Sequence, residues 1–94
     1  MNSSKVKVAV FRVVDQYTRE DQFIISSMMP ASKPISEAKA FFNECLAKHF
    51  ACIAECEEYG PLPLKMAQGM IDAAQREIPI MLVHNLLDEE RSAL

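Results

Sequence analysis

The spacing of hydrophobic and polar residues predicts three structural regions, of which the first is a β-hairpin. In residues 5–14, lysine and valine alternate at first, and then nearly every residue is hydrophobic. β-Branched and aromatic residues at this density predict a strand, and the loss of alternation indicates a second half that is covered on both faces or contains a bulge. A polar segment, residues 15–21, precedes a second strand pattern at 22–29. We therefore predict an antiparallel hairpin over residues 5–29.

The second region is a long central helix, which we predict over residues 36–59. Ser36 can cap its first turn through the hydroxyl group, and Gly60 followed by Pro61 is typical of a helix end. Between these ends, hydrophobic residues recur at spacings of three and four, which is the period of an amphipathic helix. The resulting face contains Phe41, Phe42, Cys45, Leu46, His49, Cys52, Ile53 and Cys56. This face is wide, and we expect it to be buried by the same chain or by a second copy.

The third region, residues 63–94, is predicted to be helical. A first helix fits residues 64–77, and Pro79 then interrupts the pattern. Residues 80–87 fit a further helix, whereas residues 78–83 also fit a short buried strand, so both alternatives stay open. A third strand would matter, because an isolated two-stranded hairpin is marginal in water and exposes unpaired edges.

These regions together predict an α+β fold in a single domain spanning residues 1–94. The hairpin would pack on the long central helix, one kinked or two shorter helices would follow, and helix would outnumber strand. The chain has 94 residues, of which 50% are hydrophobic and 24% charged, and this composition is typical of a globular domain with a modest core. No hydrophobic run approaches the roughly 20 residues that span a bilayer. We also see no signal peptide, and we expect a cytoplasmic protein that is not associated with a membrane.

The charge balance argues against a nucleic-acid partner. The chain has thirteen acidic and ten basic residues, for a net charge of −3. Binding to a phosphate backbone requires clustered lysine and arginine. The basic residues of the predicted hairpin are Lys5, Lys7, Arg12 and Arg19. We interpret them as a solvated strand face. The alternative is a nucleic-acid-linked regulator that binds through this basic hairpin.

Four residues of the predicted central helix are typical of metal or thiol chemistry: Cys45, His49, Cys52 and Cys56. Thiolate and imidazole are the usual zinc ligands, but a helix rises about 1.5 Å per residue, so one ion can reach only two of the four. A Cys–His nucleophile pair would lack an evident orienting group. We therefore predict no catalytic residue, no cofactor and no metal. We expect Cys45 and Cys52 to be buried and Cys56 to be the most accessible cysteine, with a metal or redox protein as the alternative.

The remaining feature that bears on function is a surplus of hydrophobic surface. Five internal methionines suit either core filling or an adaptable binding surface. The candidate interface residues are Phe11, Phe41, Phe42, Leu46, Ile53, Met66 and Met70. We expect a small, acidic, non-enzymatic protein-binding factor, an adaptor or inhibitor that occupies the surface of an unidentified partner protein and is also able to form a homodimer. Small inhibitors encoded by phages or other mobile elements, including those directed at host defence complexes, are of this general type.

Overall fold

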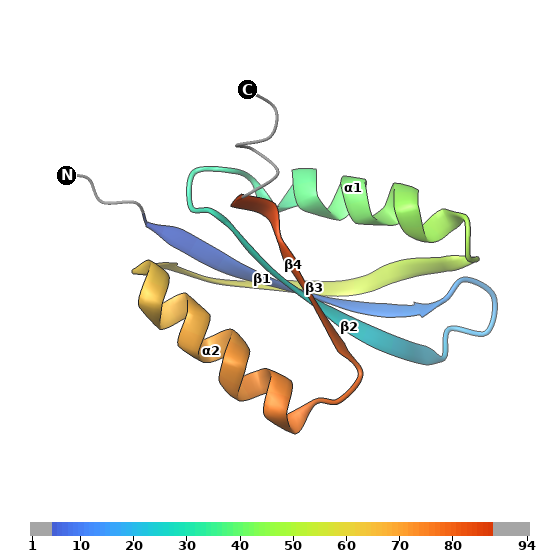
Figure 1. Cartoon of the computed structure of the whole chain (residues 1–94). Helices are drawn as coiled ribbons and strands as arrows, with labels where there is room; N and C mark the ends of the chain where they lie inside the picture. The colour runs from blue at the N-terminus through green and yellow to red at the C-terminus, as the bar shows by residue number, and fades with distance from the viewer. Residues whose placement is uncertain (1–4, 88–94) are drawn as a thin grey trace.

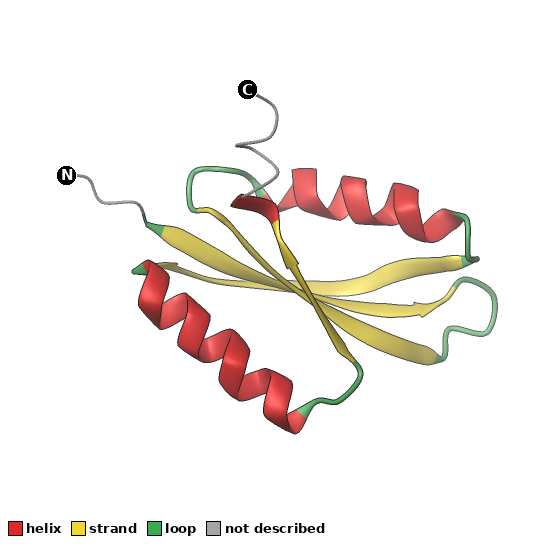
Figure 2. Cartoon of the chain, viewed as in Figure 1, coloured by secondary structure: helices red, strands yellow, loops and turns green. Residues whose placement is uncertain are grey.

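The fold is built on a four-stranded sheet that carries one helix on each face. The computed structural model describes residues 5–87. The elements follow in the order β1 (Val6–Asp15), β2 (Asp21–Pro30), α1 (Ile35–Ala47), β3 (Ala51–Leu62), α2 (Leu64–Glu77) and β4 (Met81–Asn85). In space, the strand order is β3-β1-β2-β4. Helix α1 lies on one side of the sheet and α2 on the other (Figures 1 and 2).

Strand β1 occupies the centre of the sheet, and its position explains why its sequence is hydrophobic on both faces. It pairs antiparallel with β2 along one edge and antiparallel with β3 along the other, while β2 also pairs in parallel with β4. Successive residues of a strand point to opposite faces, so Val8 and Val10 lie on the α2 side, and Ala9 and Phe11 on the α1 side. Each face is covered by a helix, and β1 therefore supplies hydrophobic residues to both.

Two clusters of buried side chains fill the two sides of the sheet. On the α1 side, Phe11 and Val13 of β1 pack with Phe42 and Leu46 of α1, and the rings of Phe11 and Phe42 meet edge to face with their centroids 5.3 Å apart. The cluster on the α2 side contains Val6, Val8, Met28, Ala67, Ile71 and Met81. Burial of these residues accounts for most of the packing that holds the two helices to the sheet.

The predicted long central helix over residues 36–59 is wrong. Helix α1 ends at Ala47, and the chain then forms β3, a strand of 12 residues. The register of β1 with β3 shifts between Arg12, which pairs with Glu55, and Val13, which pairs with Ile53. Ala54 is thus an extra residue, which forms a bulge and changes the spacing of the residues that face α1 from two to three. Ile53 and Cys56, which both face α1, are therefore three positions apart, as on one face of a helix, although they lie in a strand.

The turn between α1 and β3 also shows why the helix does not continue. Phe50 has a φ of 59°, in the left-handed region, which ends the right-handed helical path. The amide of Ile53 donates a hydrogen bond to the side-chain oxygen of Asn43 at 2.9 Å, which ties the new strand back to α1. At the other end of α1, the residue before the first turn is Pro34, and the helix lacks the side-chain cap predicted at Ser36.

The predicted C-terminal helical region over residues 63–94 requires a similar correction. Among the described residues, helix α2 covers 64–77, and strand β4 then pairs with β2 over residues 81–85. The chain is α+β, but its strands contain 10, 10, 12 and 5 residues and its two main helices 13 and 14, so helix does not outnumber strand. The part of the predicted helical region that falls on 88–94 lies outside the described residues.

Candidate functional site

The two outer strands of the sheet differ in how their free edges are protected. Strand β3 exposes Glu55, Glu57 and Glu58, and Pro61 lies near its end. Charged side chains and proline are the usual features that prevent an edge strand from pairing with another chain. Strand β4, at the opposite edge, has the sequence Met-Leu-Val-His-Asn and carries no carboxylate or ammonium group. The β4 edge is therefore the less protected of the two.

The hydrogen bonds between β2 and β4 determine which backbone groups of β4 face outward. The amide of Ile24 donates to the carbonyl of Ile80 at 3.4 Å, and Ile24 is the register partner of Met81. In a parallel ladder with this register, the backbone groups of Leu82 and His84 point toward β2. Those of the intervening residues point away from the sheet.

The outward groups belong to Met81, Val83 and Asn85. The amide of Met81 already donates to the carbonyl of Ile78 at 3.1 Å within the preceding turn. Among the described residues, the amides of Val83 and Asn85 and the carbonyls of Met81 and Val83 remain available to another strand. This alternating set of donors and acceptors matches the groups that an added strand presents.

An apolar hollow lies beside β4 on the α1 side of the sheet. Its volume is about 380 Å³, which falls within the range of about 300–1,000 Å³ that is typical of binding sites. The residues that line it come from β2, α1 and β4: Phe23, Ile25, Phe41, Phe42, Cys45, Leu46, Leu82, Val83 and His84. Leu82 is 56% exposed and Val83 43%, so the β4 wall of the hollow is accessible from solvent. The hollow and the open edge thus form one continuous candidate site.

Two buried polar atoms lie on neighbouring strands close to this site. The Oγ of Ser27 and the Nδ1 of His84 are buried and have no hydrogen-bond partner among the described residues. Ser27 and His84 are register partners in the pairing of β2 with β4. The His84 ring packs against Phe41 and Phe42, with centroid distances of 6.0 and 5.4 Å. His84 is therefore a packing residue of the hollow.

The structure places the predicted interface residues in two different environments. Phe11, Phe42, Leu46 and Ile53 are buried in the chain's own core, whereas Phe41, Met66 and Met70 are exposed. The exposed three do not form one surface, because Phe41 lies on α1 and the two methionines lie on α2, across the sheet. Only Phe41, Phe42 and Leu46 line the hollow beside β4. The β4 residues themselves were absent from the predicted set, although an uncharged hydrophobic run after Pro79 was their visible signal.

The four Cys and His residues do not form a stripe on one helix. Cys45 lies on α1, whereas Cys52 and Cys56 lie on β3, and His49 belongs to the turn between them. Cys45 is exposed and the other two cysteines are half-buried, so the prediction of a buried Cys45 and a most accessible Cys56 is wrong. Within residues 5–87, no three His, Cys, Asp or Glu side chains are grouped as a metal site would require.

Two of the four basic residues of the hairpin, Lys7 and Arg12, form ion pairs with carboxylates. The Nζ of Lys7 lies 2.9 Å from Oε1 of Glu58, and Arg12 forms ion pairs with Asp21 and Glu55. Hydrogen bonds from Arg12, first to Asp21 and then to Glu55, raise the pKa of its guanidinium group. Lys7 and Arg12 face opposite sides of the sheet, because they are separated by an odd number of positions in β1.

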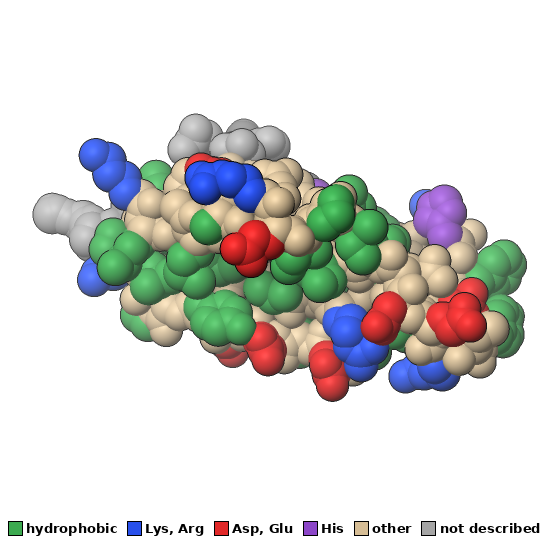
Figure 3. All heavy atoms as spheres, turned by 90° about the horizontal axis from the view of Figure 1, so that it is seen from below, with side chains coloured by type: hydrophobic (Ala, Val, Ile, Leu, Met, Phe, Trp, Pro, Cys, Tyr) green, Lys and Arg blue, Asp and Glu red, His purple; other side chains and the backbone are tan. Residues whose placement is uncertain are grey.

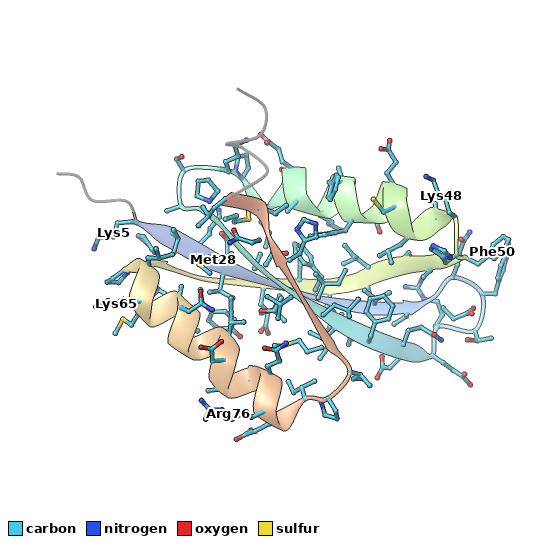
Figure 4. All side chains as sticks on the ribbon, in the orientation of Figure 1. Lys5, Met28, Lys48, Phe50, Lys65 and Arg76 are labelled. Atoms are coloured by element: carbon cyan, nitrogen blue, oxygen red, sulfur yellow. The ribbon has the colours of Figure 1, made fainter. Side chains whose placement is uncertain are left out.

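The other cations are dispersed over the molecule. Lys5 and Lys65 lie at one end, and Lys48 lies at the other (Figure 4). On the α2 side, hydrophobic side chains form a band across the surface, and acidic and basic side chains are interspersed around it (Figure 3). The described part of the chain therefore has no continuous basic surface of the kind that tracks a phosphate backbone.

An exposed aromatic pair lies in the loops at one end of the sheet. Tyr17 and Phe50 are 72% and 58% exposed, and their ring centroids are 6.1 Å apart. The amide of Gln16 donates to the carbonyl of Phe50 at 2.8 Å and joins the two loops. This pair is remote from β4 in the fold, since Phe50 lies at the end of the molecule that Figure 4 labels with Lys48.

Comparison with models of protein families, with curated proteins and with solved structures gives no match to this chain. Neither of the helices described within residues 5–87 has the length and hydrophobicity needed to cross a membrane. The β4 edge and the hollow are consequently the features from which a function is inferred.

Proposed function

We propose that this chain is a small non-enzymatic protein-binding factor that accepts an extended segment of its partner along the β4 edge. The observation that carries this proposal is the uncharged β4 edge beside an apolar hollow, in contrast to the glutamate-rich edge of β3. When a strand is added to a sheet edge, main-chain hydrogen bonds provide affinity, and pockets for alternate side chains provide specificity.

The hollow defines the chemistry of the partner segment. Alternate side chains of an added strand point to the α1 side, where Phe41 and Leu82 border the hollow. A large aliphatic or aromatic side chain would bury its surface there, whereas a charged one would lose its hydration without gaining an ion pair. The expected partner segment is therefore extended and uncharged, with large hydrophobic residues at every second position.

Such a factor acts as an adaptor or an inhibitor by occupying a surface of its partner, in the manner of small inhibitors that phages and other mobile elements direct at host defence complexes. A protein partner is favoured over nucleic acid because Lys7 and Arg12 are already paired with carboxylates and acidic residues outnumber basic ones. The three free cysteines suit the cytoplasm, where thiols stay reduced. A second copy of the chain is a further candidate for the same edge.

Selection of displayed random ten-residue peptides on the purified protein tests this proposal. We expect enriched peptides to be uncharged and to alternate large hydrophobic residues with others. Their binding should be lost in Val83→Pro, which removes an outward amide but no hydrogen bond to β2, a change that edge strands tolerate.

Phe50→Ala provides the control, because it removes an exposed aromatic ring from the loops remote from β4. It should leave peptide binding unchanged, and circular dichroism should show both variants folded. Enriched peptides whose affinity survives Val83→Pro would contradict the proposal.

A further inference from the structure

We infer that, in the absence of a partner segment, the β4 edge is occupied by a second copy of this chain, paired antiparallel about a two-fold axis at Val83. This inference rests on the edge identified under the proposed function, and it names the occupant of that edge in the free protein. Its basis is the self-complementarity of β4 in backbone hydrogen bonding, charge and steric access.

The outward backbone groups of β4 match those of a second β4 in one register. The amide and carbonyl of Val83 both point away from the sheet, so Val83 of each copy can donate to and accept from Val83 of the other. The same register places Asn85 opposite Met81, and the Asn85 amide can donate to the Met81 carbonyl, a bond that symmetry repeats. The Met81 amide, which would face Asn85 in return, already donates to Ile78. No outward amide of the strand is then left without a partner.

The charges of the two edges favour β4 over β3 as the self-pairing strand. In the register centred on Val83, His84 lies opposite Leu82, and no two like charges face each other. A β3 pair related by a two-fold axis would bring Glu55, Glu57 and Glu58 of the two copies close together, and like charges on directly opposed positions are destabilising.

The helices leave the β4 edge accessible. Helix α1 packs chiefly on β3, and α2 packs on β1 and β2. The helices meet β4 only through side chains on the two faces of the sheet, as Phe42 meets His84 and Ile71 meets Met81, and not along its outer edge. Figure 1 shows β4 crossing in front of the other strands, between the two helix layers. A second copy can therefore approach in the plane of the sheet and extend it.

Hydrophobic side chains along the β4 edge would be covered by this pairing. Leu82 is 56% exposed and Val83 43%, and Phe41 beside them is 38% exposed. A specific dimer buries roughly 800 Å² on each partner, and a strand of five residues needs such flanking side chains to approach that area. We expect a dissociation constant in the micromolar range, weak enough for a partner segment to displace the second copy. Self-association and partner binding would then be mutually exclusive.

Disulfide formation by Val83→Cys tests the register. Opposed Cα atoms of a hydrogen-bonded antiparallel pair lie about 5.5 Å apart, within the range of about 4.4–6.8 Å that a disulfide spans. Ile80→Cys is the matched control, because Ile80 is similarly exposed, at 54%. Its two copies would be six positions apart in the ladder, or about 20 Å. We expect covalent dimer to form at least tenfold faster with Val83→Cys than with Ile80→Cys or the wild type, which gives the background of the native cysteines.

Equal rates for the two variants would overturn the inference. A light-scattering mass that stays at 10.6 kDa from micromolar to millimolar concentration would also overturn it. Failure of this inference is distinguishable from failure of the proposed function. Selected peptides that bind in a Val83-dependent manner to a strictly monomeric protein would leave the proposed function standing. A dimer crosslinked through Val83→Cys, without any such peptide, would leave only the self-association.

Discussion

Substitution of Gly60 by alanine should destabilise the protein strongly, because this glycine meets two independent constraints. Its φ is +138°, a backbone conformation that residues with a side chain rarely adopt. A Cβ added at Gly60 would lie 3.0 Å from both the Cβ of Lys7 and the carbonyl oxygen of Val6. The second of these neighbours is backbone, so the start of β1 would have to move away from β3.

The expected cost follows from these two constraints. A sparsely populated backbone conformation costs about 1–3 kcal/mol, and insertion of an atom into a filled space costs a further 1–3 kcal/mol or so. The lower conformational entropy of the unfolded chain with alanine offsets about 0.4–1 kcal/mol of this sum. We therefore expect Gly60→Ala to lower the free energy of unfolding by about 2–4 kcal/mol. In a domain of this size, the melting temperature would fall by roughly 10–30 °C.

Gly69 provides a matched control within the same chain. It lies in the middle of α2, and a Cβ added there would meet no atom within 4 Å apart from its chain neighbours and the backbone of its own helix. Gly69→Ala should therefore stabilise the protein by about 0.5–1 kcal/mol, since glycine is unfavourable in a helix interior. Urea denaturation followed by circular dichroism measures both variants on one scale. If the two substitutions shift the unfolding midpoint in the same direction, the constraints assigned to Gly60 are wrong.

Three further predictions concern single side chains. Ser27→Ala should stabilise the protein by about 1 kcal/mol in urea denaturation, because the buried Ser27 hydroxyl has no hydrogen-bond partner among the described residues; a clear loss of stability would contradict this. Cys45 should react first with a thiol reagent under native conditions, as shown by mass spectrometry of the labelled peptides, since it is the exposed cysteine; simultaneous reaction of all three cysteines only on unfolding would refute its exposure. Hydrogen bonds from the backbone amides of Thr18 and then Tyr17 lower the pKa of Asp15, so its carboxylate stabilises the fold above the ordinary pKa of 3.8 and loses this effect as pH falls through the lowered value. The difference in unfolding midpoint between wild type and Asp15→Asn should accordingly shrink as the pH is lowered from neutral to below 3.8, and a constant difference would count against this role.

The parts of the fold that local patterns could predict are those in which one period dominates. Helix α2 has the bounds 64–77 that its spacing predicts, because its polar face is exposed and its buried residues Ala67 and Ile71 recur at the helical period. Strands β1 and β2 overlap most of the predicted hairpin region, although β2 begins at Asp21 and ends at Pro30, one residue beyond each predicted bound; β-branched residues are dense there and a polar loop separates the strands. In both cases the packing and pairing partners seen in the structure favour the same conformation as the local sequence.

The segment that became β3 could not be predicted in this way, because its bulge at Ala54 gives a strand the spacing of a helix. Its conformation depends on pairing with β1, which lies about forty residues earlier in the chain, and such non-local pairing leaves little mark on the local pattern. The candidate site escaped prediction for a related reason. The hydrophobicity of Phe41 is visible in the sequence and marks it as a candidate interface residue. Val83 can pair with another strand because it lies at a sheet edge, and that position depends on the strand order.

Amide hydrogen exchange at single residues of β4 tests the central claim most directly, namely that the outward groups of this strand bind another strand. The amides of Leu82 and His84 point toward β2 and should be protected at every concentration. We predict that the amides of Val83 and Asn85 exchange rapidly in dilute protein. Their exchange should slow at least tenfold when a selected peptide binds or when the protein concentration is raised. If Val83 and Asn85 continue to exchange rapidly while new protection appears along β3, the β4 edge is not the binding edge.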